Sequence, residues 1–178
     1  GHESRLLVGA RRTTEESVVE LPWTRGVPGL KRFTNRLERW FGLQYVYSPR
    51  FRNASASFPR RVDLVHVHSL YGAESYADVG ALPSLSRRWP MVLSLHDMWM
   101  LTGHCGYNTG CPRWLTGCGR CPDLALPFAI PKDGTRLNWW RKRRALSATM
   151  AHVTACSEWL ADQARKSPIF RHKSIHAI

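Results

Sequence analysis

No apolar run in this chain of 178 residues approaches the roughly 20 residues that a membrane-spanning helix needs. The first residues, Gly1 to Arg5, lack the basic and then apolar layout of a secretory signal peptide. Five cysteines without an export signal indicate reduced thiols, which favours a cytoplasmic protein over one held together by disulfides. The first methionine is Met91, so we expect the chain to be a piece of a longer protein.

Acidic side chains are scarce. The sequence has 13 Asp and Glu against 26 Lys and Arg, which gives a net charge of +13. This balance favours an anionic partner such as a nucleic acid, an acidic membrane surface or a phosphorylated substrate, although a GC-rich genome would also produce it. The hydrophobic fraction of 43% argues against disorder and for a folded core.

Runs typical of strands alternate along the chain with the spacing typical of helices. The apolar run at 91–95 predicts a buried strand, and the apolar stripe within 30–41 predicts an amphipathic helix with a basic opposite face. We expect strands over 5–9, 63–68, 91–95, 151–155 and from 174 onward, helices over 30–41, 79–87, 133–150 and 157–166, and loops over 10–26 and 43–60. This order predicts an α/β fold built from parallel βαβ units.

A cysteine-rich loop is expected over residues 97–132, directly after the strand at 91–95. Its cysteines have the spacing C-x5-C-x6-C-x2-C and are Cys105, Cys111, Cys118 and Cys121. Four thiolates satisfy tetrahedral zinc, and closed sites of this kind are structural. The alternative is four reduced, partly buried thiols, and His104 is a further candidate ligand. The fifth cysteine, Cys156, is expected to pack as a small buried residue.

Histidines are placed where two expected strands end. His96 and Asp97 follow the strand at 91–95, and His68 ends the strand at 63–68. Ligands of open α/β sheets bind at the carboxyl ends of strands, where an imidazole can donate to a sugar hydroxyl or a phosphate. The alternative for His96 is a structural histidine bonded to the backbone, and we expect His66 to serve packing.

Aromatic residues accompany these histidines. Trp99 and Tyr107 lie in the loop and could stack on the face of a sugar. The alternative, which position alone favours, is that they fill the core, since aromatic side chains bury large areas.

Several stretches resemble a known family. LHDMWMLTGHCGY followed by C-x-x-W-x-T-G-C-x-x-C-P, together with VDLVHVHSLYG, LPSLSRRWP and VTACSEWLADQARKSPIF, resembles the N-terminal domain of glycosyltransferase family 4. The nearest branch is the colanic-acid type of polysaccharide-biosynthesis transferase. The cysteine-loop motif is specific to that branch, and the resemblance runs from about Arg5 to the last residue.

The resemblance implies a GT-B fold, in which two Rossmann-like domains face each other across a cleft. Residues 1–178 would form part of the acceptor-side domain, with the family's first strand before Gly1 and the nucleotide-binding domain after Ile178. Catalysis would be retaining and need no catalytic metal, and the chain alone would be inactive. His96 matches the family's cleft histidine, so we predict His96 and Asp97 as catalytic and His68, Trp99 and Tyr107 as substrate-binding.

The implied partners are a nucleotide-sugar donor and a glycan or lipid-linked acceptor in surface polysaccharide biosynthesis. The helix at 30–41, or the basic cluster Arg141 to Arg144, would then contact anionic lipid at the inner membrane face. An alternative function is a basic zinc module that binds nucleic acid. It is disfavoured because the cysteines do not precede a recognition helix, so we expect no nucleic acid. A third alternative is an inactive α/β scaffold.

Overall fold

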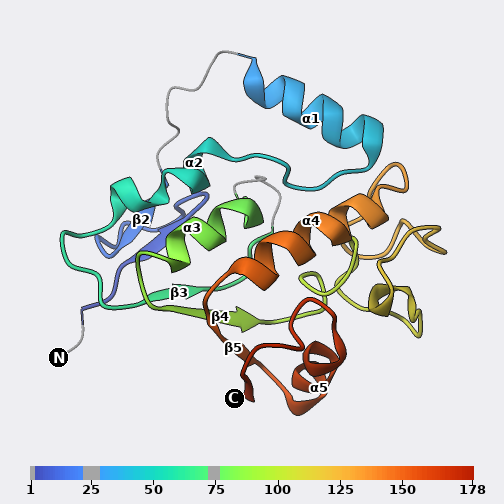
Figure 1. Ribbon diagram of the computed structural model, residues 1–178. Coiled ribbons are helices and arrows are strands. Elements are labelled where there is room, and N and C mark those ends of the chain that lie inside the picture. Colours follow the sequence, from blue (N-terminus) through green and yellow to red (C-terminus); the bar gives the residue numbers. More distant parts are fainter. Residues whose placement is uncertain (1–2, 22–28, 72–76) are drawn as a thin grey trace.

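The computed structural model describes residues 3–21, 29–71 and 77–178 and contains a parallel four-stranded sheet (Figure 1). The strands are β3 (Val65–Val67), β4 (Met91–Leu95), β5 (His152–Ala155) and β6 (Ile175–Ala177), in the order β3-β4-β5-β6. Helices follow the strands along the chain, as the sequence predicts. The α/β fold with a Rossmann-like parallel sheet flanked by helices is therefore confirmed.

The two faces of this sheet differ in polarity. Val67, Leu93, Val153 and Ile175 occupy one face, and all are buried in the core. The same apolar cluster includes Leu82, Leu146 and Leu160, from α3 (Leu82–Ser86), α4 (Thr135–Ala148) and α5 (Glu158–Lys166). The opposite face carries polar residues that alternate with these along the strands, namely His66, Ser94, Thr154 and His176.

The N-terminal segment forms a second, smaller sheet. β1 (Leu6–Val8) pairs in parallel with β2 (Val18–Glu20), and these strands are separate from the main sheet. The strand expected at 5–9 is confirmed, but the loop expected over 10–26 is wrong at β2. Arg50, 2% exposed, holds this sheet through donation to the carbonyls of Gly9 and Leu21 and to the Glu20 carboxylate.

Short helices occupy the other expected loop. α2 (Pro49–Arg52) begins at Ser48, whose hydroxyl accepts a hydrogen bond from Phe51 N and so caps the helix. A 3₁₀ turn, η1 (Ala54–Ser57), follows it. A second 3₁₀ turn, η2 (Val79–Ala81), leads into α3 and places the start of that helix close to the position expected from the sequence.

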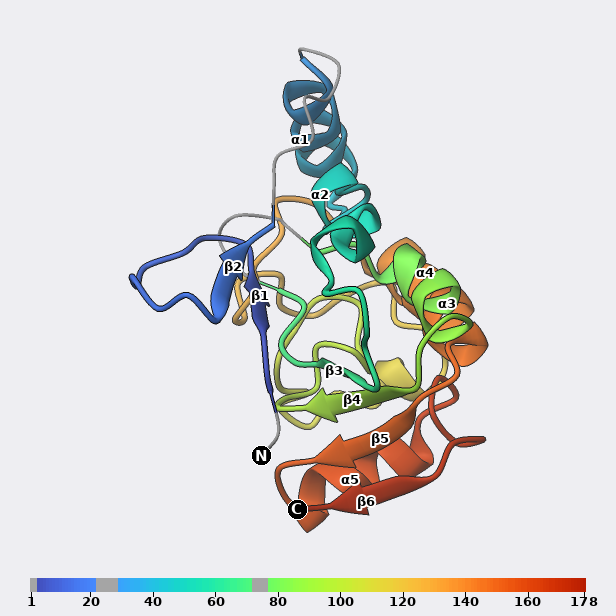
Figure 2. The same ribbon diagram turned by 90° about the vertical axis from the view of Figure 1, so that its left-hand side faces the viewer.

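α1 (Leu30–Phe41) projects away from the main sheet (Figures 1 and 2). It ends at Gly42, whose φ of 62° is a left-handed conformation that glycine adopts without strain. A Cβ at Gly42 would lie 1.8 Å from the Lys132 carbonyl oxygen, and one at Gly134 would lie 2.3 Å from that of Phe41. Two glycines thus allow the end of α1 to contact the backbone that leads into α4.

In the described ranges, no helix is both long enough and apolar enough to cross a bilayer.

Candidate functional site at the carboxyl edge of the sheet

Two of the predicted site residues meet at the carboxyl edge of the main sheet. β3 and β4 pair with Val67 opposite Leu93, so the residues that follow the two strands lie side by side. His68 Nδ1 is 3.0 Å from His96 Nε2, and both residues are exposed. The His66 ring lies beside them, with its centroid 3.9 Å from that of His68. Three imidazoles therefore form a solvent-accessible cluster where this fold type places ligands.

His66 does not serve packing as expected, because it is exposed on the polar face of the sheet. Its Nε2 lies 2.7 Å from Ser94 Oγ, and that hydroxyl lies 2.7 Å from Thr154 Oγ1. This relay of polar groups crosses from β3 to β5 and orients the His66 ring. Because each of these three polar side chains has a hydrogen-bond partner, the polar row is stable on this face.

The surroundings of His66 and His68 favour the neutral form of both rings. Burial, followed by the charges of His66 and His96, lowers the pKa of His68. Burial, followed by the charge of His96, lowers the pKa of His66. A neutral imidazole carries one N–H donor and one acceptor nitrogen, so these rings can both give and take a hydrogen bond near neutral pH.

Asp97 shapes the turn that follows β4. It is half-buried, and its Oδ1 accepts a hydrogen bond of 2.7 Å from Trp99 N. In the same turn Thr102 N donates to the Met98 carbonyl. The Tyr71 hydroxyl hydrogen-bonds to the Asp97 carboxylate, and burial followed by this carboxylate raises the pKa of Tyr71. Asp97 therefore holds the loop beside His96 in position, which is a different role from the catalytic one predicted.

Trp99 lies in the core, where a sugar cannot reach its indole. Its exposed fraction is 1%, and its Nε1 donates to Gln44 Oε1 at 2.9 Å. The rings of Tyr45 and Tyr71 pack around it, each with its centroid at 5.5 Å. The interpretation of Trp99 as substrate-binding is therefore corrected in favour of the core alternative. The indole anchors the start of the cysteine-rich loop.

A pair of exposed aromatic rings lies on this side of the molecule. Tyr107 is 56% exposed and Trp159 is 48% exposed, and their ring centroids are 6.3 Å apart. Gly106, which precedes Tyr107, accepts a hydrogen bond from Met98 N, so the loop returns to the end of β4. The sequence interpretation missed Trp159, although its position just after β5 was a signal, because residues after a parallel strand share this edge.

Cys156 also differs from its expected position. It is exposed rather than buried, and its Sγ lies 3.7 Å from the His96 carbonyl oxygen. Cys156, which follows β5, thus contacts His96, which follows the neighbouring strand β4.

The other four cysteines belong to the loop that follows β4. All four are half-buried free thiols, and all four line one cavity together with His104. Burial raises the pKa of Cys118 to about 12, so its thiol is protonated near neutral pH and is a poor nucleophile. Among the residues that the structure describes, no three Cys, His, Asp or Glu side chains are already arranged to hold a metal ion.

Lys142, on α4, is a buried cation close to this cavity. It is 3% exposed, and its Nζ donates to the carbonyls of Trp99 at 2.7 Å and Thr102 at 3.1 Å. The ammonium also lies 3.6 Å from the centroid of the Trp99 ring, within the range of a cation–π interaction. Burial lowers the pKa of Lys142 well below its ordinary value, and the Cys118 and Cys105 thiols are its strongest charge partners.

The sequence model for the family described as Glycosyltransferase Family 4 matches residues 1–178, the whole chain. The chain belongs to glycosyltransferase family 4. This membership confirms the resemblance that the sequence motifs indicated. The histidine cluster thus lies at the carboxyl edge of the parallel sheet of a family 4 domain.

A segment of this family 4 chain is also similar to a curated protein. It is 50% identical over 34 residues to the putative colanic acid biosynthesis glycosyl transferase WcaC of Escherichia coli (strain K12). The match covers 19% of the chain and only 8% of that relative, far less than two thirds of its length. No solved structure matches the chain.

Proposed function

We propose that this family 4 chain is the acceptor-side domain of a retaining glycosyltransferase with the GT-B fold. The whole protein would transfer a sugar, of the hexosyl type, from a nucleotide-sugar donor to a glycan acceptor in surface polysaccharide biosynthesis. The observation that carries the proposal is the exposed pair of His68 and His96, 3.0 Å apart at the carboxyl ends of adjacent parallel strands. Family membership and the WcaC match support the reaction class.

In this proposal His96 contacts the transferred sugar. His96 Nε2 lies against His68 Nδ1, which leaves the other ring nitrogen of His96 for a hydrogen bond with a sugar hydroxyl or phosphate oxygen. Asp97 positions the loop, because its carboxylate holds Trp99 N and the Tyr71 hydroxyl. The nucleotide would bind mainly to the second GT-B domain, and no metal would take part in the transfer.

Tyr107 and Trp159 are the residues that we propose for stacking on the glycan acceptor. Sugar rings have one apolar face that packs on aromatic rings, and both side chains expose about half of their surface. The two come from different segments, the cysteine-rich loop and α5, and meet at 6.3 Å.

The acceptor proposal includes contact with an anionic membrane surface at its cytoplasmic side. α1 exposes Phe33 at 59%, Trp40 at 60% and Phe41 at 57%, and it also carries the exposed cations Arg32 and Arg36. An amphipathic helix with exposed aromatic residues and arginines suits the interface of a bilayer. A lipid-linked acceptor would then be bound close to the lipid headgroups.

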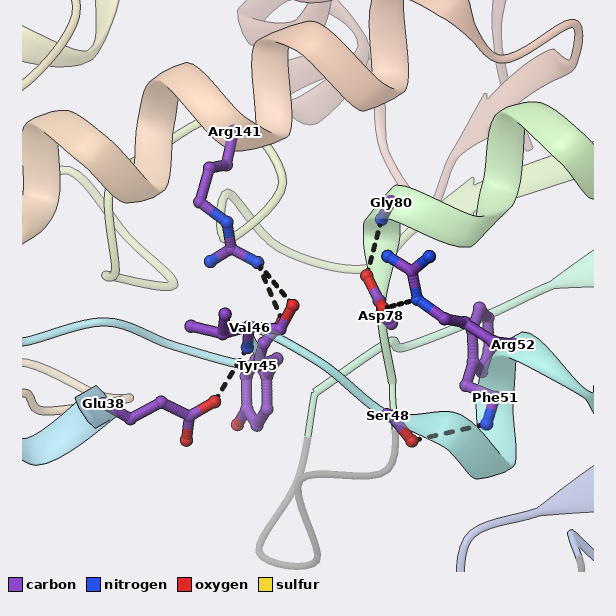
Figure 3. Close-up of polar contacts among 9 residues, drawn as sticks. All are labelled: Glu38, Tyr45, Val46, Ser48, Phe51, Arg52, Asp78, Gly80 and Arg141. Carbon is purple, nitrogen blue, oxygen red and sulfur yellow. Dashed lines mark hydrogen bonds and ion pairs between the residues drawn. The ribbon is translucent and has the colours of Figure 1, made fainter. Parts of the chain in front are cut away.

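The basic cluster on α4 is a weaker candidate for lipid contact. Figure 3 shows Arg141 pointing into the molecule, where its guanidinium donates to the carbonyls of Tyr45 and Val46. Lys142 is buried, so only Arg143 and Arg144 of the four remain exposed. We therefore assign the membrane contact to α1.

The alternative of a nucleic-acid-binding zinc module receives less support. The one helix within residues 97–134 of the described structure is the short 3₁₀ turn η3 (Arg113–Leu115). It offers no recognition helix that could enter a groove of DNA.

The function is tested with the full-length protein. Radiolabelled nucleotide sugars of several types are incubated with it and with a lipid extract that contains acceptors, and label in the lipid fraction is counted. We expect label from one donor, in a product that keeps the anomeric configuration of the donor. Inverted configuration, or no labelled product with any donor in extracts that support transfer by a known family 4 enzyme, would contradict the proposal.

A further inference from the structure

The four cysteines of the loop have no part in the proposed sugar contact, yet the fold brings them together. Cys105, Cys111, Cys118 and Cys121 all line one small cavity, which is bounded by the loop and the start of α4. They come from positions up to 16 residues apart, and no disulfide joins them. Half-buried thiols that surround one space are a typical donor set for a soft divalent ion.

Two groups at the cavity point to a charged occupant. His104 is 1% exposed, and among the described residues its buried Nδ1 has no hydrogen-bond partner of ordinary geometry. Its Nε2 lies 3.4 Å from Cys121 Sγ and 3.1 Å from the Asp123 carbonyl oxygen. On another side, Gly103 N donates to Cys118 Sγ at 3.2 Å. N–H donors directed at sulfur stabilise thiolate rather than thiol.

The charge of Lys142 supports the same conclusion. Its ammonium is buried and donates to two carbonyl oxygens, and it forms no salt bridge with any residue that the structure describes. Thr102, one of its acceptors, lines the cavity and donates through its hydroxyl to the Cys105 carbonyl. A buried cation is costly unless a nearby anion compensates it. The Asp97 carboxylate acts on this ammonium, but more weakly than thiolates at Cys118 and Cys105 would.

We propose that this cavity binds one structural zinc ion through the thiolates of Cys105, Cys111, Cys118 and Cys121. Zinc at +2 with four thiolates at −1 gives a centre of net charge −2, which the Lys142 ammonium offsets in part. The four thiol protons pass to solvent on binding. His104 donates to the Cys121 thiolate and is not a ligand.

The side chains must turn toward one point for this site to form. In the described ranges the sulfurs do not yet converge in ligand geometry. Without an ion, bringing the protonated thiols together would not stabilise the loop. Hydrogen bonds within the loop hold them instead, such as those of Cys118 with Gly103 and of Cys121 with Asp123. A bound ion would replace the second of these contacts with a metal–sulfur bond, which is far stronger.

The test measures zinc in the purified full-length protein after dialysis, by elemental analysis, together with the number of reactive thiols. We expect about one zinc per chain. Cys111→Ser and Cys121→Ser should lose it, whereas Cys156→Ser, which removes the one cysteine outside the cavity, should keep it. His104→Gln should also keep it, because a glutamine N–H can still donate to sulfur.

A second measurement uses the unmodified protein, so its result does not depend on whether the variants fold. Cobalt replaces zinc in the unmodified protein, and its absorption spectrum reports four-thiolate tetrahedral coordination. A protein without zinc whose four loop thiols react freely and whose cobalt spectrum shows no thiolate bands would overturn the proposal. Loss of zinc in His104→Gln with retention in Cys121→Ser would overturn the four-cysteine ligand set.

Discussion

His68 and His96 are 28 residues apart in the sequence, yet His68 Nδ1 lies 3.0 Å from His96 Nε2. His68 directly follows β3 and His96 directly follows β4, and these strands are adjacent and parallel, so their carboxyl ends lie side by side. Two neutral rings can share one N–H···N hydrogen bond, whereas two imidazolium rings at this distance repel each other. The pair is thus both a polar contact at the proposed site and a group that responds to pH.

The first prediction concerns the titration of His68. Burial, then the charges of His66 and His96, lower its pKa below the ordinary value of 6.5, so its NMR titration midpoint should fall below that value. His96→Asn removes one of these charges and should move the midpoint back upward. A midpoint at or above 6.5 in the unmodified protein would contradict the described cluster.

The same shift predicts how stability depends on pH. A lowered pKa in the folded state means that the unfolded chain binds more protons just below pH 6.5. The contribution of His68 is therefore fully present above about pH 6.5 and is lost as the pH falls toward the folded-state pKa. Urea unfolding should show that the unmodified protein loses more stability between pH 7.5 and pH 5.5 than the His68→Asn variant does. An equal loss in the two proteins would contradict a lowered pKa of His68.

The second prediction concerns Lys142. Lys142→Met removes the donor to two buried carbonyl oxygens, of Trp99 and Thr102, and should lower the free energy of unfolding by roughly 1–3 kcal/mol. The matched control is Arg143→Met, at the neighbouring exposed position, which should change it by less than about 0.5 kcal/mol. Equal effects of the two changes in urea unfolding would show that Lys142 is not buried.

The third prediction concerns the contact between Gly134 and the end of α1. A Cβ at Gly134 would lie 2.3 Å from the Phe41 carbonyl oxygen, so Gly134→Ala should cost roughly 1–3 kcal/mol of stability through overpacking. Gly110→Ala is the control, since nothing lies within 4 Å of its Cβ and only its φ of +83° opposes the change, at about 1 kcal/mol. Thermal unfolding that ranks Gly110→Ala as the more damaging change would be inconsistent with this contact.

The fourth prediction concerns membrane contact. If α1 binds lipid, the full-length protein should co-sediment with vesicles that contain anionic lipid, less so at high salt, because each arginine near the surface contributes about 1 kcal/mol. Phe33→Ser with Trp40→Ser should reduce the bound fraction severalfold. Trp140→Ser, an equally exposed tryptophan on α4, should leave it unchanged. Equal binding by both variants would remove α1 from the proposal.

Sequence patterns predicted the main sheet and α1, α4 and α5, although α1 leaves Phe33, Trp40 and Phe41 of its apolar stripe exposed. β2 was missed because three residues between polar flanks carry no readable period. The burial of Lys142 was not predicted, because Lys142 belongs to the basic cluster Arg141 to Arg144, which was expected to contact anionic lipid. Its spacing of three residues from both Trp139 and Ala145, which are buried, was the signal that it shares their face.

The site residues also divide into those that the sequence predicted and those that it did not. His68 and His96 were predictable, because the end of a parallel strand is visible in the sequence. The burial of Trp99 and the exposure of Trp159 were not, since they depend on contacts with Gln44 and Tyr107 from distant segments. A sequence pattern reports the face of an element but not the segment that comes to cover it.

The most direct test of the proposed site is the kcat/KM of sugar transfer by the full-length protein with His96→Ala. Removing one hydrogen-bond donor to the reacting sugar should lower it by about 10²–10³-fold. His152→Ala, an exposed histidine at the opposite end of the parallel strands, is the matched control and should stay within about twofold of the unmodified protein. Equal kcat/KM values for the His96 and His152 variants would contradict the assignment of the carboxyl edge as the site of transfer.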